Sequence, residues 1–171
     1  MADSHTNDRE WIRRPSGRVI LINQRDEVLL FAAGASQIVE GDTRVWVLPG
    51  GGAEAGEAPA VTAARELYEE TGLLVEPEQL QGPVGVSGGP WTFRGIDYLT
   101  EDSFFFLRIA SWEVSTAGFS EIEHELFEEH RWWSLAELAS TSETVFPREL
   151  APLVARLLAG DVPADPVELP W

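Results

Sequence analysis

Residues 51–73 read GGAEAGEAPAVTAARELYEETGL, and within them a glycine-rich turn gives way to a helical pattern. Pro59 suits the first turn of an α-helix, where a backbone N–H would have no partner inside the helix. Gly72 suits the left-handed position that follows a last turn. The spacing therefore predicts a helix over residues 59–71, preceded by a tight turn.

The predicted helix gathers three carboxylates on one face. At about 100° per residue, Glu66, Glu69 and Glu70 fall within an arc of roughly 100°. The opposite side is mostly apolar, so we expect it to pack on a sheet. That side consists of Ala60, Val61, Ala64, Leu67, Tyr68 and Thr71.

Like charges three or four positions apart destabilise a helix by about 0.2–0.5 kcal/mol per pair, so this acidic face needs compensation. Arg65 can pair with Glu69, but one arginine cannot neutralise three glutamates. A hard divalent cation can, because Mg²⁺ takes oxygen ligands and bridges protein carboxylates to substrate phosphates. The alternative is a solvated face in a very acidic protein. The turn at residues 48–52, LPGGG, favours a metal site, because its carbonyls can bind a cation and its amides can meet phosphate oxygens.

The composition excludes several classes of partner and of functional site. The 171 residues include 29 Asp and Glu against 12 Lys and Arg, for a net charge of −17. This charge repels a phosphate backbone, so we expect no nucleic-acid polymer as partner. The chain has 0 cysteines, which excludes disulfides and thiolate sites and fits a reducing cytoplasm. Its polar start and the lack of a long apolar run predict a soluble, cytoplasmic protein with no membrane partner.

The chain resembles the Nudix (MutT-like) hydrolases. Gly51, Glu57 after five residues, and the run Arg65-Glu66-Leu67-Tyr68-Glu69-Glu70-Thr71-Gly72-Leu73 after seven more match every fixed position of the Nudix box. The flanks at residues 46–51 and 131–138 also look like those of the family. The resemblance therefore spans roughly residues 17–140.

The resemblance implies an α/β (α+β) fold, the Nudix α/β/α sandwich with a mixed β-sheet flanked by helices. It implies Mg²⁺- or Mn²⁺-dependent cleavage of a nucleoside diphosphate linked to another moiety, by attack of metal-activated water on phosphorus. Glu66, Glu69 and Glu70 would be metal ligands, together with a backbone carbonyl of the Gly51 region. Arg65 would orient a glutamate, and Glu57 would support the metal site.

The general base is left open by this resemblance, since family members recruit it from different places. Glu57, Glu70 and the acidic run over residues 121–130 all compete for the role. We favour one residue of that run as an extra ligand or base, against the alternative that the run is an exposed acidic segment. The candidates are Glu125, Glu128 and Glu129.

Groups that select the substrate should lie outside the box. An aromatic ring at Trp91 or Phe93 could stack on a base, while Arg44 or Arg94 pairs with a phosphate. The alternative is that these rings belong to the core. The prolines after the box do not match the spacing associated with ADP-ribose-specific members. Nucleoside triphosphates, dinucleoside polyphosphates and sugar nucleotides therefore remain as small nucleotide-type diphosphate substrates.

Other functions fit less well. A catalytically weak Nudix-fold protein that binds or senses a nucleotide metabolite is the alternative, although such proteins tend to lose box glutamates and this chain keeps them. An isoprenoid diphosphate isomerase on the same fold would use a cysteine, which is absent. The sequence leaves the oligomeric state open, with a homodimer as one candidate.

The rest of the chain alternates strands and helices without the period of a doubly wound sheet. We expect a flexible arm over residues 1–16, a single domain over 17–160 and an irregular tail over 161–171. A long loop should hold residues 88–95, and a capping box should open a short helix at Ser134–Glu137. Strands are predicted at residues 18–22, 28–31, 45–48, 104–109 and 131–133, and a last helix at 147–159.

Overall fold

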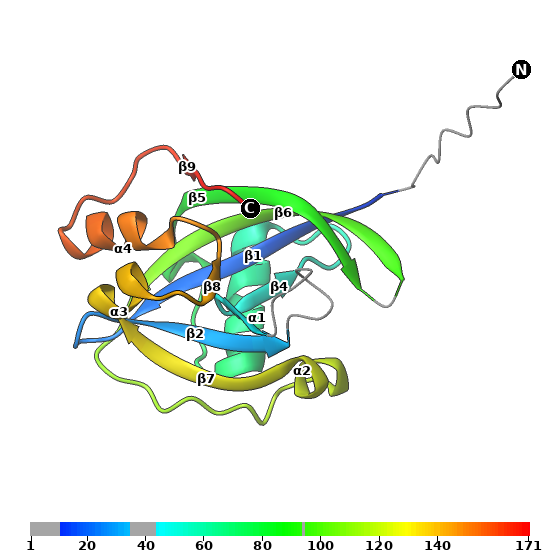
Figure 1. The fold of residues 1–171 in the computed structure, drawn as a ribbon, viewed down its shortest axis with the longest axis horizontal. Helices are drawn as coiled ribbons and strands as arrows, with labels where there is room; N and C mark the ends of the chain where they lie inside the picture. Colours follow the sequence, from blue (N-terminus) through cyan, green and yellow to red (C-terminus); the bar gives the residue numbers. More distant parts are fainter. Residues whose placement is uncertain (1–10, 35–43, 94) are drawn as a thin grey trace, which may run out of the picture.

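The computed structural model describes residues 11–34, 44–93 and 95–171. In that part of the chain a mixed sheet of nine strands is flanked by helices, as expected (Figure 1). The strands are β1 (Ile12–Ile22), β2 (Glu27–Gly34), β3 (Arg44–Val47), β4 (Gly50–Gly52), β5 (Gln81–Phe93), β6 (Ile96–Arg108), β7 (Phe127–Ser134), β8 (Thr144–Phe146) and β9 (Val167–Glu168). The helices are α1 (Pro59–Thr71), α2 (Glu121–Leu126), α3 (Leu135–Ser140) and α4 (Leu150–Leu158), with a short 3₁₀ turn, η2 (Pro77–Gln79).

Strand β1 lies at the centre of the sheet. It runs antiparallel to β2 and β4 and parallel to β6. Its apolar segment is buried on both faces, which explains why polar residues do not alternate with apolar ones there. Val19 and Leu21 join the core under α1, while Ile20 and Ile22 join the core on the other face, with α4.

Helix α1 spans the predicted residues and ends at Gly72, whose φ is 75°. Its buried face differs from the expected one: Val61 and Tyr68 are 43% and 52% exposed, whereas Glu66 and Glu70 are buried. Ala64, Leu67 and Thr71 are buried as expected, but the buried face also includes Glu66 and Glu70, so it does not lie opposite the acidic face. A hydrophobicity pattern ranks glutamates as surface residues, and it cannot represent a helix that presses carboxylates against a neighbouring strand.

The segment before Gly17 is part of the sheet. Residues 12–16, which we expected in the flexible arm, pair with β6 from Ile12 onward, and residues 1–10 lie outside the described chain. The expected loop over residues 88–95 is also wrong, because Gly88, Gly89 and Pro90 pair with β6 in a long hairpin. In both places backbone pairing with a neighbouring strand outweighs the weak strand preference of glycine and proline.

The C-terminal residues differ from the expected irregular tail as well. Strand β9 pairs in parallel with β5, and Leu169 is 6% exposed. Helix α4 begins at Leu150 rather than at Pro147, and Pro152 lies in its first turn, where its missing N–H removes no helical hydrogen bond. Of the helices in the described residues, none has the length and apolar character needed to span a bilayer.

Gly17 lets α1 approach β1. A Cβ at this position would lie 2.7 Å from the backbone nitrogen of Ala63 and would also collide with the carbonyl oxygen of Pro59. We therefore expect Gly17→Ala to force the helix away from the strand and to lower the free energy of unfolding by about 3 kcal/mol or more, measured by urea denaturation.

Gly34→Ala is the matched control, because the nearest atom of the described residues to its added Cβ lies 3.6 Å away, at ordinary contact distance. Equal urea midpoints for the two variants would contradict the close helix–strand packing.

Candidate active site

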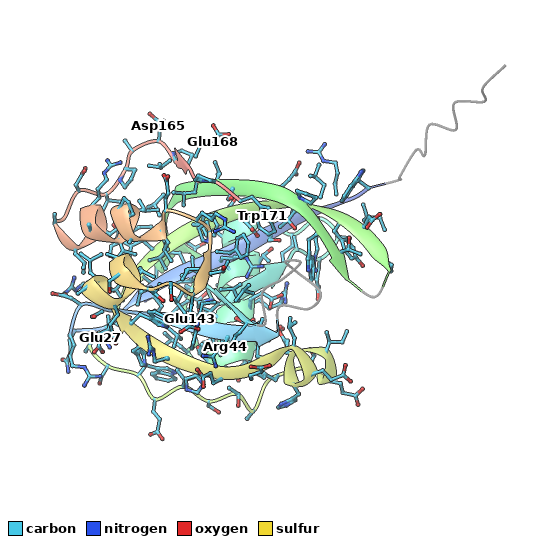
Figure 2. The ribbon with its side chains drawn as sticks, in the orientation of Figure 1. Glu27, Arg44, Glu143, Asp165, Glu168 and Trp171 are labelled. Carbon is cyan, nitrogen blue, oxygen red and sulfur yellow. The ribbon has the colours of Figure 1, made fainter. Side chains whose placement is uncertain are left out.

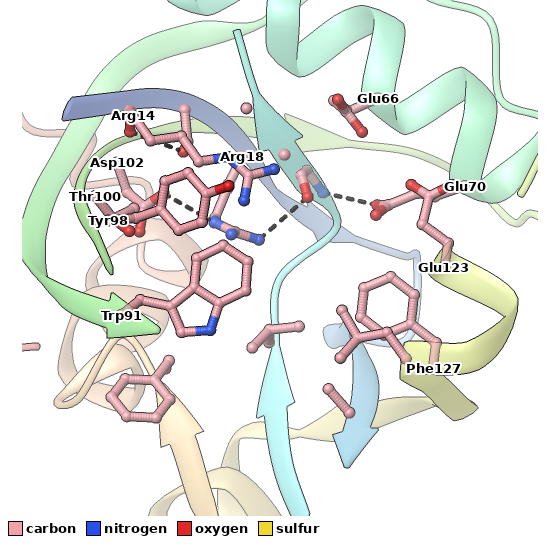
Figure 3. A pocket seen from close by; sticks show the side chains of 18 of the residues that line it. Arg14, Arg18, Glu66, Glu70, Trp91, Tyr98, Thr100, Asp102, Glu123 and Phe127 are labelled. Atoms are coloured by element: carbon pink, nitrogen blue, oxygen red, sulfur yellow. Dashed lines mark hydrogen bonds and ion pairs between the residues drawn. The ribbon is translucent and has the colours of Figure 1, made fainter. Parts of the chain in front are cut away.

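Three carboxylates from two helices converge beside β4. Glu66 and Glu70 come from α1 and Glu123 from α2, and one oxygen of each lies within 4.8 Å of the others. Glu66 is 8% exposed and Glu70 only 1%. Figure 3 shows the three side chains along one side of a pocket. The side chain of Glu123 also accepts the backbone N–H of Ser120 at 2.6 Å, so it caps α2 as well.

Burial and mutual repulsion disfavour the ionised forms of Glu66 and Glu70. Burial raises the pKa of Glu70 well above its usual value, and the charge of Glu66 adds to the rise. Burial also raises the pKa of Glu66, although Arg65 opposes that effect. Oxygen donors whose charges repel one another in a buried site match the preference of Mg²⁺ and Mn²⁺ for carboxylates. The donor set therefore fits a hard divalent cation.

Arg65 links the other box residues. Its guanidinium donates to both oxygens of Glu57 at 2.9 Å and to an oxygen of Glu66 at 2.8 Å. It also donates to Glu69 at 3.2 Å and to the carbonyl of Gly52 at 3.1 Å. The hydrogen bonds from Arg65 lower the pKa of Glu57 to about 2. Arg65 therefore bridges the ionised Glu57, before α1, to Glu66 and Glu69 on the helix.

The glycine turn is shaped to fit the carboxylates. The N–H of Gly50 donates to Glu70 at 2.7 Å. A Cβ at Gly51 would lie 2.7 Å from the carboxyl carbon of Glu66, so only glycine leaves room for that side chain. Gly51 is also paired with Gly17 of β1, which places the turn beside the start of α1.

Arg18 supports the same turn from the other side. Its Nη1 donates to the carbonyls of Leu48 at 3.1 Å and of Gly50 at 3.2 Å, and its Nε donates to Asp102 at 3.0 Å. Asp102 is 3% exposed. Figure 3 shows the resulting path from Asp102 through Arg18 and Gly50 to Glu70. The peptide groups around Gly50 are thus held by the partly buried cation of Arg18 and by the buried carboxylate of Glu70.

A pocket of about 550 Å³ opens beside the carboxylates. Glu66, Glu69, Glu70 and Glu123 line it together with the glycine turn. The strands of the sheet contribute its other walls, with Arg14, Arg18, Trp91, Tyr98, Thr100 and Asp102. Rings of Trp91 and Tyr98 lie 5.5 Å apart, so the pocket joins an acidic end to an aromatic one.

Of the residues predicted to bind the substrate, some line the pocket and others do not. Trp91 lines the pocket. Arg44 does not; it pairs with Glu129 and Glu143, each at 3.3 Å, and Figure 2 labels it beside Glu143. The prediction for Arg44 is therefore not supported by its position. The side chain of Phe93 and the whole of Arg94 lie outside the described residues.

The acidic run contributes a different glutamate from those we favoured. Glu123 joins the carboxylate cluster, whereas Glu125, Glu128 and Glu129 do not line the pocket. The reason is the helix α2, which turns one residue of the run toward α1 while β7 carries the later ones along the sheet. The capping box at Ser120 and Glu123 is a sequence signal that could have located the start of this helix.

Arg14, Arg18, Tyr98 and Asp102 were also missed by sequence reasoning. They are distant in the chain and meet because β1 and β6 are parallel neighbours, with Arg14 opposite Thr100 and Arg18 opposite Phe104. Every second residue of each strand then faces the pocket. Local motifs carry no signal for such a pairing.

Comparisons with known proteins agree with this geometry. A family model described as the NUDIX domain matches residues 12–156. An RNA pyrophosphohydrolase of Roseobacter denitrificans is 30% identical over 135 residues, which cover 73% of this chain and 79% of that protein. An RNA pyrophosphohydrolase of Cereibacter sphaeroides is 41% identical over 63 residues, which cover 37% of this chain and 36% of that protein.

Solved structures share the fold at lower identity. A dihydroneopterin triphosphate pyrophosphohydrolase from E. coli has a TM-score of 0.58 and 18% identity, covering 88% of this chain and 99% of that one. A MutT protein from Methanosarcina mazei has a TM-score of 0.53 and 18% identity, covering 89% and 97%. The family model matches most of the chain, and Gly51, Glu66, Glu69 and Glu70 of the box line one pocket. The chain belongs to the Nudix family of hydrolases, which act on phosphoric anhydride bonds.

Proposed function

We propose that this Nudix hydrolase is a divalent-metal-dependent pyrophosphohydrolase that cleaves a nucleoside diphosphate linked to another moiety. The observation that carries the proposal is the cluster of Glu66, Glu70 and Glu123 at the edge of a pocket of about 550 Å³. A diphosphate is shielded by its own negative oxygens, so its hydrolysis requires these charges to be neutralised. Bound Mg²⁺ or Mn²⁺ supplies that neutralisation and activates the attacking water.

The residues of the chain have distinct roles in this proposal. Glu66, Glu70 and Glu123 hold the cation, with Glu69 and the carbonyl of the Gly51 region as further ligands. Arg65 orients Glu66 and Glu69 through its hydrogen bonds at 2.8 and 3.2 Å. Glu57 is a positioning residue, because both of its oxygens are occupied by Arg65.

The aromatic end of the pocket suits the nucleoside part of the substrate. Trp91 and Tyr98 offer rings on which a base can stack. Nucleoside triphosphates, dinucleoside polyphosphates and sugar nucleotides all combine a base with a diphosphate. The net charge of −17 disfavours a long nucleic acid and favours a small, cation-neutralised substrate. The absence of cysteine is consistent with work in a reducing cytoplasm.

A substrate panel tests the activity itself. Purified protein with Mg²⁺ or Mn²⁺ is offered nucleoside triphosphates, dinucleoside polyphosphates, ADP-ribose, sugar nucleotides and an RNA with a 5′-triphosphate end, the last because the Roseobacter relative is named an RNA pyrophosphohydrolase. Products are resolved by mass, and ¹⁸O water identifies the attacked phosphorus. No turnover of any of these anhydrides would refute the proposal and leave the binding or sensing alternative.

Removing one carboxylate of the cluster should cost much of the activity. We expect Glu70→Gln and Glu123→Gln each to lower kcat on the order of 100-fold or more at saturating Mg²⁺, comparable to the loss of one electrostatic stabiliser of the transition state. Glu121→Gln, on the exposed start of α2, is the matched control and should keep kcat within about twofold.

The same assay compares Glu123 with its neighbours. Larger losses in Glu125→Gln, Glu128→Gln or Glu129→Gln than in Glu123→Gln would show that the sequence-based candidates, rather than the residue in the cluster, serve this site.

Glu57 should make stability depend on pH. Its pKa is lowered to about 2 from the usual 4.5, so its contribution is complete above about pH 4.5 and is lost as the pH falls toward 2. In buffer that contains a chelator to remove metal ions, we expect Glu57→Gln to lower the free energy of unfolding by about 1.5–3 kcal/mol at pH 6. This is the range for hydrogen bonds to charged groups. The difference from the parent protein should shrink steadily between pH 5 and pH 3, measured by urea denaturation.

Glu54→Gln, in the exposed turn next to it, is the control and should show no such pH-dependent difference. A stability difference for Glu57→Gln that stays constant over this pH range would mean that its ion pair with Arg65 is not formed in solution.

A further inference from the structure

Arg14 lies in the pocket between its acidic and aromatic ends. It comes from β1, and it packs so closely on the glycine turn that a Cβ at Gly52 would lie 2.6 Å from its Nε. Its guanidinium carbon lies 5.0 Å from the ring centroid of Trp91 and 5.6 Å from that of Tyr98. Figure 3 shows Arg14 above these rings, on the same side of the pocket as Arg18.

The guanidinium of Arg14 has no direct hydrogen-bond or ion-pair partner among the described residues. None of the described residues gives its guanidinium a hydrogen-bond acceptor or a carboxylate within ion-pair distance, although the side chain is partly buried. Its neighbour Arg13 is exposed and paired with Glu101, and Arg18 is paired with Asp102. Burial, and then repulsion from Arg18, lower the pKa of Arg14, while weaker attraction to Tyr98, Glu66 and Asp102 acts in the opposite direction. A partly buried cation without an anion is unfavourable unless a ligand supplies the anion.

The contacts of Arg14 leave its donors free for such a ligand. Cation–π contacts use no N–H donor, so the planar guanidinium of Arg14 keeps its N–H groups available. This planar fork matches two oxygens of a phosphate. Among the described residues, the other cation that lines the pocket is Arg18, which already donates to Leu48, Gly50 and Asp102.

We propose that Arg14 binds a phosphate group of the substrate, at the part of the pocket between the carboxylate cluster and the rings of Trp91 and Tyr98. This assignment rests on the proposed function, since it places the diphosphate between a cation held by the glutamates and a fixed arginine. Arg14 then offsets phosphate charge that the metal does not reach, in a pocket whose remaining charged residues are mostly acidic.

The test measures binding as well as activity. A nucleoside diphosphate with a methylene bridge, which cannot be hydrolysed at the bridge, is titrated by calorimetry into the parent protein, Arg14→Gln, Arg14→Lys and Arg13→Gln, each with Mg²⁺. We expect Arg14→Gln to raise Kd roughly 10- to 100-fold, the range for the loss of a charge-assisted hydrogen bond. Arg14→Lys should recover part of the affinity. Arg13→Gln, the adjacent arginine on the other side of the strand, should change Kd less than about twofold.

Thermal unfolding without ligand separates binding from packing. Because Arg14 has no carboxylate partner among the described residues, Arg14→Gln should keep the ligand-free Tm of the parent protein or raise it. A lower Tm with an unchanged Kd would overturn the proposal and leave Arg14 as a packing residue. A Kd for Arg14→Gln equal to that for Arg13→Gln would overturn it as well.

The two proposals fail in different ways. If no anhydride is hydrolysed but Arg14→Gln still weakens binding of the analogue, the phosphate site stands and the catalytic function falls. If the parent protein hydrolyses a nucleotide and Arg14→Gln has the same KM and Kd, the catalytic function stands and the phosphate site falls.

Discussion

The site depends on forcing carboxylates together on the buried side of one helix. Glu66 and Glu70 are less exposed than several apolar residues of α1, and burial raises the pKa of both. The chain tolerates this arrangement because particular groups surround it: the N–H of Gly50, the guanidinium of Arg65 and the space left by the missing side chain of Gly51. Apolar residues at these positions would avoid the cost of burying carboxylates, so the arrangement is not explained by helix stability alone and fits the proposed cation site.

Two further residues, Glu123 and Arg18, complete the acidic end of the pocket, and each also makes a second structural contact. Glu123 reaches the cluster from α2 while it caps the first turn of that helix, so the position of the carboxylate and the start of the helix are set together. Arg18 holds the carbonyl of Gly50 while it neutralises Asp102 under the pocket. Such shared contacts make the acidic end rigid without a large hydrophobic surface of its own.

The sequence predicts well whatever is local. The bounds of α1, its end at Gly72 and the capping box at Ser134 depend on neighbours along the chain, and the structure confirms them. The resemblance to the Nudix box identified the family, and Gly51, Glu66, Glu69 and Glu70 of the box line one pocket, whereas Glu57 and Arg65 do not. The buried face of α1 was predicted only in part: Leu67 and Thr71 are buried as expected, but Glu66 and Glu70 are buried too, because the hydrophobic pattern ranks glutamate as exposed.

What the sequence does not predict depends on pairing between distant strands. The arm, the supposed loop over residues 88–95 and the tail all enter the sheet through β6 or β5. Arg14 was set aside with the arm, although it reaches the centre of the pocket. Its place follows from strand geometry: Arg14, Ser16 and Arg18 line the pocket, while Gly17 between them faces α1. Inserting or deleting one residue between Arg14 and Gly17 would hardly change the composition of this strand. It would nevertheless turn the side chain of Arg14 to the opposite face of the sheet, which is covered by α1. Among relatives, we therefore expect insertions and deletions between these positions to be much rarer than substitutions at them.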